Sequence, residues 1–421
     1  MRMPHRRTPL LALLCLLMAL GLVPGEPPGG LAGLVAPYRQ NIMAWEAGHF
    51  LDKWLARLGD ALRPGPSRAE RLAQVDEYFA LGAQLRTAQG ALTRALAQTG
   101  EGPQADALAA EAAALEARRR ALAPVVEETL EAAISGVVDA MGVSGRLGPV
   151  RWPPIDFTFE RGGLVLVRSP RDAVQRLPDV LLRPDVTLLE QVGLETEAEA
   201  LAPDASALVV RIGGVATYPA QVSPDGDLRS TLRLAAHEWT HHWLIFRPLG
   251  RHWFDGGELQ SINETVADLF AEEVGDAAYT LLTGIPVERP PWQLPTLTAP
   301  TEPEPGVFDY TLQMRATRLR LDELLATGDV PGAEAYLEQR RLAFVEHGYA
   351  IRRLNTAWFA FFGTYGGSAG TVSPIEAQLR AIRADAGSIP AFLERVASIT
   401  EPGQLEALAR EAGWAPDPVL P

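Results

Sequence analysis

The sequence is organised around Thr231–Asp268, and at the centre of that stretch lies His237-Glu238-Trp239-Thr240-His241. Positions i and i+4 of a helix lie on one face. On a helix, the imidazoles of His237 and His241 would therefore be close enough to share one metal ion. Glu238 would lie at the edge of that face, where it can hold and deprotonate a water. Neutral imidazole suits zinc, and two nitrogens leave room for a third ligand and a water.

The surroundings of this pentapeptide favour a helix and supply a third ligand. The pentapeptide lies in the helix-compatible stretch Leu232–Phe246, which Pro248 and Gly250 close. A second helical stretch runs from Asn263-Glu264-Thr265-Val266-Ala267-Asp268 to about Val274. Glu264 and Asp268 are again i and i+4. One carboxylate can therefore bind the metal while the other supports a ligand from outside.

The two motifs, HEWTH followed by NETVAD, resemble those of the gluzincin metallopeptidases, the thermolysin-like group. The resemblance covers about Ala205–Val274 only. It implies that His237, His241 and Glu264 are zinc ligands and that Glu238 is the general base. It also implies that Asp268 orients a ligand histidine, His237 in our interpretation.

The resemblance has two departures and one further implication. The gap of 22 residues between His241 and Glu264 implies a loop insertion at Gly250–Gly257. No GxMxN-type aminopeptidase motif lies upstream, which argues against that branch. In the family an edge strand ahead of the metal helix pairs with extended substrate, and Gly214–Tyr218 holds that position here. An ordinary core strand at Gly214–Tyr218 is an equal alternative on sequence alone.

Plainer interpretations of the same residues remain open at this point. Ser261-Ile262-Asn263-Glu264 is also a capping box, in which Glu264 would only close the start of a helix. The histidines could form a surface cluster without metal. His242 and His252 could compete as ligands, although His242 would point about a hundred degrees away from His241 on a helix.

Composition limits the class of protein. The 421 residues allow two or three domains, and 47% hydrophobic with 21% charged residues is ordinary for a globular protein. The formal charge of −14 argues against nucleic acid as a partner. The sole cysteine, Cys15, leaves no internal disulfide.

Residues 1–30 are expected to be a targeting segment and a spacer. Arg2, Arg6 and Arg7 precede an apolar run, Leu10–Val23, whose length suits a signal peptide better than a membrane span. A Pro- and Gly-rich spacer follows. An uncleaved anchor is the alternative, and it would associate the protein with a membrane. Either interpretation predicts an extracytoplasmic protein, secreted or membrane-anchored.

A helical domain is expected over residues 31–143. Pro64-Gly65-Pro66 and Gly100-Glu101-Gly102-Pro103 divide its Ala- and Leu-rich sequence into three long helices. Pro124 should kink the third. A bundle or hairpin of long helices is therefore predicted, with a hinge at Gly142–Gly148.

The metallopeptidase domain implied by the resemblance spans residues 144–421. Its first part, 144–285, would hold a small mixed sheet and the zinc helices. Ile155–Glu160 and Leu164–Val167 read as a β-hairpin, and Ala207–Ile212 and Val215–Val222 as further strands. A short helix is expected around Thr187–Leu194.

The last part of the chain is expected to be helical. Residues 286–306 form a Pro-rich loop and residues 307–421 a helical lobe. Its expected helices are Leu312–Ala326, Pro331–Glu346, Tyr349–Phe362, Pro374–Ile399 and Glu401–Ala412. The fold class is therefore α+β, with long N-terminal helices before a zincin-like domain.

Peptide hydrolysis also needs a donor to the developing oxyanion besides zinc. The polar and aromatic stretch Arg352–Tyr365 is the richest source of one. Tyr365 is our choice, and Tyr310, His347 and Asn355 are alternatives.

These patterns predict an extracytoplasmic zinc metallopeptidase with Glu238 as general base and a peptide or protein as substrate. One alternative is a zinc-stabilised, non-catalytic envelope protein that binds a partner through its long helices. Another is a hydrolase of a different bond. An intact Glu238 favours an enzyme, because a structural zinc site does not need that acid.

Overall fold

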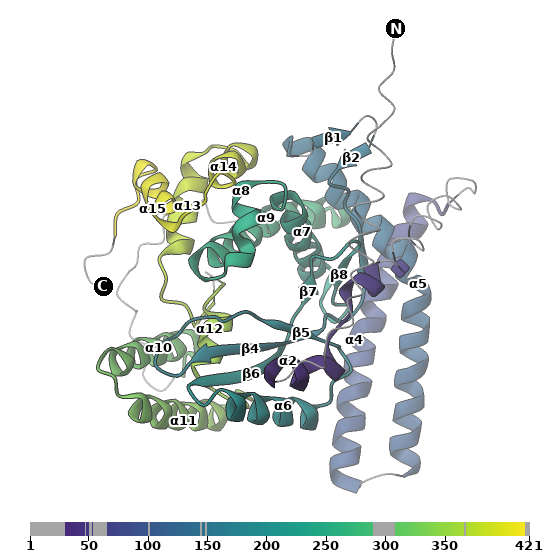
Figure 1. Ribbon diagram of the computed structural model, residues 1–421. Coiled ribbons are helices and arrows are strands. Elements are labelled where there is room, and N and C mark those ends of the chain that lie inside the picture. The colour runs from purple at the N-terminus through teal and green to yellow at the C-terminus, as the bar shows by residue number, and fades with distance from the viewer. Residues whose placement is uncertain are drawn as a thin grey trace.

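Two long antiparallel helices and a body of shorter helices around small sheets make up the computed structural model (Figure 1). The structure describes residues 30–46, 48–49, 53, 65–99, 102–143, 145–147, 150–288, 308–365 and 368–416. The expected α+β class is confirmed. The expected targeting segment and most of the Pro-rich loop lie outside the described residues. No helix among the described residues is long and apolar enough to cross a membrane.

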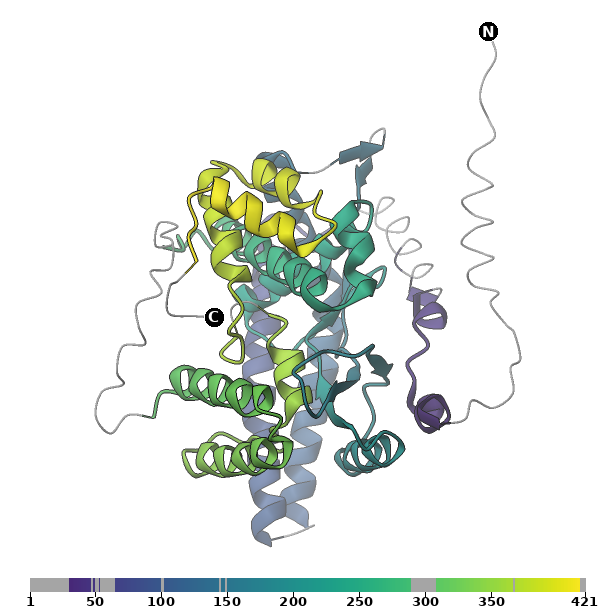
Figure 2. The same ribbon diagram turned by 60° about the vertical axis from the view of Figure 1, so that its left-hand side comes forward.

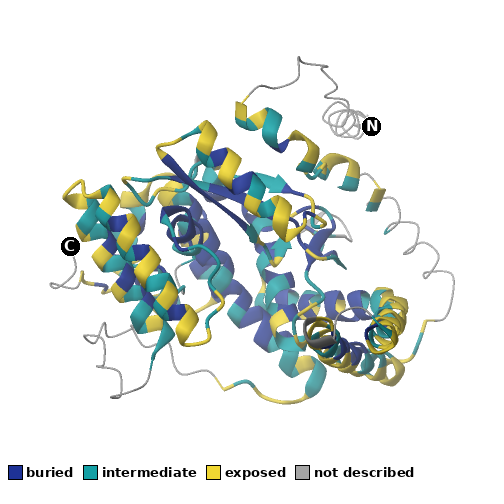
Figure 3. Ribbon diagram, turned by 90° about the horizontal axis from the view of Figure 1, so that it is seen from below, coloured by how far each residue is buried: buried dark blue, intermediate teal, exposed yellow. Residues whose placement is uncertain are grey.

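The long helices are α4 (Arg68–Thr99) and α5 (Pro103–Met141), which pack along each other. Gly142 ends α5 with a φ of 76°, and its N–H donates to the carbonyl oxygens of Val138 and Asp139. The helix is continuous through Pro124. Near the body, both helices contribute buried side chains to the core that also holds α7 (Leu228–Leu244) and α9 (Gly257–Thr283). Farther out, their outer faces are exposed (Figure 3).

The single long helix expected at the start of this region is interrupted at residues 39–41, and residues 42–46 are helical again. Residues 30–38 form only α2 (Gly30–Val35) and a short 3-10 helix, η1 (Ala36–Tyr38). The chain then runs extended along β5 (Val180–Leu182), where the N–H of Gln40 donates to the Leu181 carbonyl at 3.2 Å. This segment therefore packs on the sheet side of the body, because backbone pairing with β5 replaces helical hydrogen bonds.

Two three-stranded sheets form the β part of the body. One has the order β5-β4-β6, all antiparallel, and the other has the order β3-β8-β7. In the second, β3 pairs parallel with β8, and β7 is an antiparallel edge strand. The remaining strands are β3 (Phe157–Phe159), β4 (Leu164–Pro170), β6 (Ala205–Arg211), β7 (Gly214–Val215) and β8 (Ala220–Val222), and a small hairpin pairs β1 (Gly145–Leu147) with β2 (Val150–Trp152).

The expected hairpin of Ile155–Glu160 with Leu164–Val167 is wrong, because β3 and β4 belong to different sheets. The two glycines between these strands let the chain pass very close to other backbone. A Cβ on Gly162 would lie 2.6 Å from the Ile212 carbonyl oxygen. Arg161-Gly162-Gly163 therefore forms a crossing between two sheets and not a turn.

The strand expected over Ala207–Ile212 is confirmed as β6, but Val215–Val222 is two strands. The Thr217 N–H donates to the Val215 carbonyl at 2.8 Å in a tight turn, and Pro219 has no N–H to donate. The expected short helix is confirmed and longer, as α6 (Leu188–Leu201). Thr187 and Glu190 form its capping box.

The C-terminal helices form two groups, which Figure 2 shows apart from each other. The first group packs on the β5-β4-β6 sheet, and the second packs in the same core as α7 and α9. The expected helix Tyr349–Phe362 begins only at Thr356, and Pro374–Ile399 is two helices. The first group is α10 (Tyr310–Ala326), α11 (Val330–Glu346) and α12 (Thr356–Phe362); the second is α13 (Ile375–Asp385), α14 (Ile389–Val396) and α15 (Pro402–Glu411).

Candidate metal centre

Two packed helices carry the site: α7 (Leu228–Leu244) and α9 (Gly257–Thr283). Asp227 caps α7 in a reciprocal pair with Ser230. Trp239 fixes the rotation of α7, because its buried indole packs on Phe270 of α9 and donates to the Pro153 carbonyl at 3.1 Å. The histidine face of α7 consequently meets α9.

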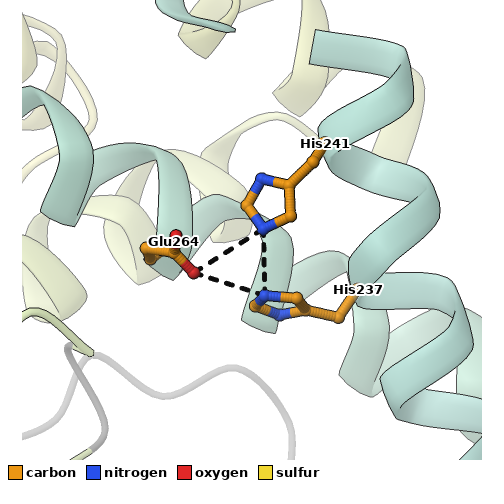
Figure 4. A group of neighbouring side chains, drawn as sticks. All are labelled: His237, His241 and Glu264. Atoms are coloured by element: carbon orange, nitrogen blue, oxygen red, sulfur yellow. Dashed lines mark hydrogen bonds and ion pairs between the residues drawn. The ribbon is translucent and has the colours of Figure 1, made fainter. Parts of the chain in front are cut away.

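His237, His241 and Glu264 converge on one point (Figure 4). The Nε2 atoms of the two histidines are 3.1 Å apart. Glu264 Oε2 lies 3.3 Å from His237 Nε2 and 3.6 Å from His241 Nε2. Ligands bound to a tetrahedral zinc at about 2.0–2.1 Å are about 3.3 Å from one another. The three ligand atoms therefore have the spacing that one zinc ion requires, with a fourth position left over.

Each of the three residues also makes a contact through the atom that does not face the centre, and this contact orients its side chain. His237 Nδ1 lies 2.9 Å from Asp268 Oδ1, as expected from the i, i+4 spacing of Glu264 and Asp268. His241 Nδ1 lies 2.9 Å from Asn263 Oδ1. Both Nδ1 atoms can thus carry the proton, so that both Nε2 lone pairs face the centre.

Trp253 supplies the orienting contact of Glu264. It lies on η2 (His252–Asp255), in the loop expected between the two motifs, and its indole N–H donates to Glu264 Oε1 at 2.9 Å. This leaves Glu264 Oε2 directed at the two imidazoles. Sequence analysis did not identify Asn263 or Trp253 in these roles.

Neighbouring groups shift the pKa values of His237 and Glu264 in opposite directions. Burial alone would lower the pKa of His237, but hydrogen bonds to Asp268 and Glu264 raise that pKa well above its usual value. Burial alone would raise the pKa of Glu264, whereas the two imidazoles lower it well below its usual value. An ionised carboxylate beside basic nitrogens suits a divalent cation.

Glu238 is buried next to the centre and lies against the backbone of Gly214 in β7. Within the described part of the chain, no hydrogen bond or ion pair occupies its oxygens. Burial, and the charges of Glu264 and Asp268, raise its pKa above the usual value, although the two imidazoles oppose this. These properties suit a general base.

A cavity of about 380 Å³ opens beside His237 and Asp268. Its wall also includes Arg233, Glu272 and Arg380. The three candidate ligands therefore have open space beside them, on the side of His237.

Tyr365 lies close enough to the centre for the carboxylates of Glu264, Asp268 and Glu238 to oppose ionisation of its hydroxyl. Burial and these acids raise the pKa of Tyr365 well above its usual value, so its hydroxyl stays protonated. The three alternatives are used elsewhere. Asn355 caps α12, Tyr310 packs on Phe344 and Tyr349, and His347 stacks on Phe308.

The geometry excludes a capping role for Ser261 and a ligand role for His242. The capping box at Ser261 is wrong, because α9 begins at Gly257 and Ser261 lies inside it. His242 turns away from the centre, and its Nε2 lies 2.8 Å from the Thr217 carbonyl oxygen. Among the described residues, the one group spaced to hold a metal is His237, His241 and Glu264, which does not include His242 or His252.

Comparisons with models of known families, with curated proteins and with solved structures find no match to this chain.

Proposed function

We propose that this chain is an extracytoplasmic zinc-dependent peptide hydrolase whose body is zincin-like. The observation that carries the proposal is the position of Glu238, a buried carboxylate with no hydrogen bond or ion pair to the residues that the structure describes, beside three oriented metal ligands. The resemblance of HEWTH and NETVAD to the gluzincin motifs supports the same activity. The apolar run Leu10–Val23 supports secretion or anchoring in a membrane.

Each residue has a defined role in the proposed reaction. His237, His241 and Glu264 would hold the metal, and Asp268, Asn263 and Trp253 would orient them. A bound zinc supplies Lewis acidity, which polarises a carbonyl and lowers the pKa of water. Glu238 would accept the proton of the attacking water and return it to the leaving amine. The Tyr365 hydroxyl would donate to the carbonyl oxygen as it becomes negative.

One observation favours a second function. The hairpin of α4 and α5 extends beyond the shared core (Figure 1), and its outer faces are exposed (Figure 3). Such a hairpin offers a surface for a protein partner, and zinc would then serve only to stabilise the body.

The substitution Glu238→Gln separates the two functions. Gln keeps the shape of the side chain but cannot accept a proton, so the variant should retain zinc and fold while hydrolysis falls about a hundred- to ten-thousandfold. Glu258→Gln is the matched control, because Glu258 is an exposed carboxylate at the start of α9. Metal content is measured first, and cleavage of a peptide library then compares the three proteins.

Each outcome of this comparison has a clear meaning. Loss in Glu238→Gln alone supports hydrolysis by this site. Equal cleavage by the parent and Glu238→Gln rules out Glu238 as the base. A zinc-loaded parent that cleaves no peptide gives the lead to partner binding by the hairpin.

A further inference from the structure

Arg176 lies on the loop between β4 and β5, and its charge interacts with that of Glu264. Its Nε donates to Asp179 Oδ2 at 3.0 Å, and its Nη2 donates to the same oxygen. Its Nη1 donates to Thr364 Oγ1 at 3.2 Å. The guanidinium also lies 4.8 Å from the centre of the Phe361 ring. Asp179 thus fixes a cation that contacts the end of α12 twice.

Tyr365 follows directly from that end. Its N–H donates to the Phe362 carbonyl at 3.3 Å, and its ring meets the Phe361 ring edge-on with centres 5.8 Å apart. The next residues in the sequence are Gly366 and Gly367. Tyr365 therefore lies after the last turn of a seven-residue helix. Its position depends on how firmly Phe361 and Thr364 are held.

The electrostatics agree with this arrangement. Burial and the Glu264 charge raise the pKa of Tyr365, whereas the Arg176 charge lowers it. Burial alone would lower the pKa of Arg176, but Asp179, Tyr365 and Glu264 raise it. Arg176 is therefore a permanent positive charge near both Tyr365 and Glu264. Its N–H groups already serve Asp179 and Thr364, so direct capture of a substrate anion is the weaker interpretation.

We propose that Arg176, anchored by Asp179, is a positioning residue that holds the Thr364–Tyr365 end of α12 beside the metal centre. In the hydrolysis proposed above, on which this inference rests, that contact places the Tyr365 hydroxyl at the developing oxyanion. Arg176 acts through Tyr365 and touches no reacting atom.

A double-mutant cycle tests this coupling. Tyr365→Phe should lower kcat about a hundredfold with little change in KM, because it removes one oxyanion donor. Arg176→Met should lower kcat by a comparable factor in the parent and by much less in the Tyr365→Phe background. Arg176→Lys keeps the charge but cannot bind Asp179 and Thr364 together, so its loss should be intermediate.

Arg340→Met is the matched control, because Arg340 also lies over an aromatic ring, that of Phe344, but its hydrogen bonds go to Gln313 and Thr317 of α10. It should leave kcat unchanged. Hydrogen exchange gives a readout independent of activity: the amides of residues 363–365 should exchange faster in Arg176→Met and not in Arg340→Met. Zinc content should match the parent in all variants.

The outcomes distinguish this inference from the proposed function. An active parent whose kcat and exchange are unchanged by Arg176→Met overturns the positioning role alone. Equal losses of kcat in both backgrounds also overturn it, because they show that Arg176 acts independently of Tyr365. A zinc-loaded but inactive parent overturns the hydrolysis and with it the role in catalysis. Exchange then decides whether Arg176 holds the end of α12.

Discussion

The carboxylate of Glu238 lies against the backbone of Gly214, in the space that a side chain at position 214 would fill. A Cβ on Gly214 would lie 2.8 Å from Glu238 Cδ and 2.8 Å from the Gln221 carbonyl oxygen. Glycine at the edge strand β7 is thus a condition for the position of the proposed base. This contact couples the edge strand β7 to α7.

Gly214→Ala should displace Glu238 without removing a metal ligand. We expect kcat to fall about ten- to a hundredfold, part of what a general base contributes, while zinc content stays at the parent level. Gly213→Ala is the control, because its Cβ would meet only the Leu234 side chain, at 3.6 Å. Equal kcat for both variants would show that Glu238 adjusts freely.

The residues that orient the ligands should control metal affinity. Asp268→Ala, Asn263→Ala and Trp253→Phe each remove one hydrogen bond to a ligand and leave the three ligands in place. Zinc affinity should fall about ten- to a hundredfold in each variant, measured by competition with a chelator. Glu272→Ala, one turn beyond Asp268 and facing Arg380, should bind zinc like the parent. An unchanged affinity in Trp253→Phe would mean that the indole contact does not hold Glu264.

The sequence predicts the part of the site that follows from helix geometry. Spacing of four residues places His237 with His241 and Glu264 with Asp268, whatever the rest of the fold does. The roles of Asn263 and Trp253 depend instead on the angle at which α9 crosses α7 and on the path of the loop between them. Asn263 precedes Glu264, but no spacing rule connects it to His241.

The errors in the fold have the same origin. Arg161-Gly162-Gly163 has the composition of a turn, and only the position of Ile212 makes it a crossing between sheets. The stretch from residue 31 onward favours a continuous helix locally, yet pairing with β5 draws residues 39–40 into an extended path. Arg176 lies far from both motifs in sequence, so nothing local connects it with Tyr365. Tertiary contacts decide each of these cases.

The close approach of α7 and α9 at Gly275 should matter for stability and for the metal. A Cβ there would lie 2.7 Å from Arg233 Cα and 2.8 Å from Arg233 N, so the two helices would have to separate. We expect Gly275→Ala to reduce the free energy of unfolding by about 1–3 kcal/mol and to weaken zinc binding, because the same spacing sets the distance from the histidines to Glu264.

Gly136→Ala is the matched control for Gly275→Ala. Its Cβ on α5 would find only Leu281 Cδ2, at 3.9 Å. Removing a glycine from this helix should raise the free energy of unfolding by about 0.5–1 kcal/mol. Urea unfolding of both variants checks the pair. Similar stabilities would show that α7 and α9 separate without cost.

His242 should make the protein sensitive to acid. Burial lowers its pKa from 6.5 to about 4, although hydrogen bonds with the backbone of Thr217 and Ala216 oppose this. In the unfolded chain the imidazole takes up a proton near pH 6.5, and in the folded protein only near pH 4. The stability contributed by neutral His242 is therefore complete above pH 6.5. It is lost as the pH falls from 6.5 to 4, by at most about 3 kcal/mol.

Urea unfolding between pH 7.5 and pH 4, in a range set by these two values, checks this. A chelator in every sample keeps metal binding out of the comparison. In His242→Gln the amide can still donate to the Thr217 carbonyl but does not titrate, so the free energy of unfolding should fall less on acidification than in the parent. His347→Gln, at an exposed histidine, should follow the parent. Parallel curves for the parent and His242→Gln would show that His242 takes up its proton at the same pH in the folded and the unfolded protein. The burial of His242 would then not be the source of any acid sensitivity.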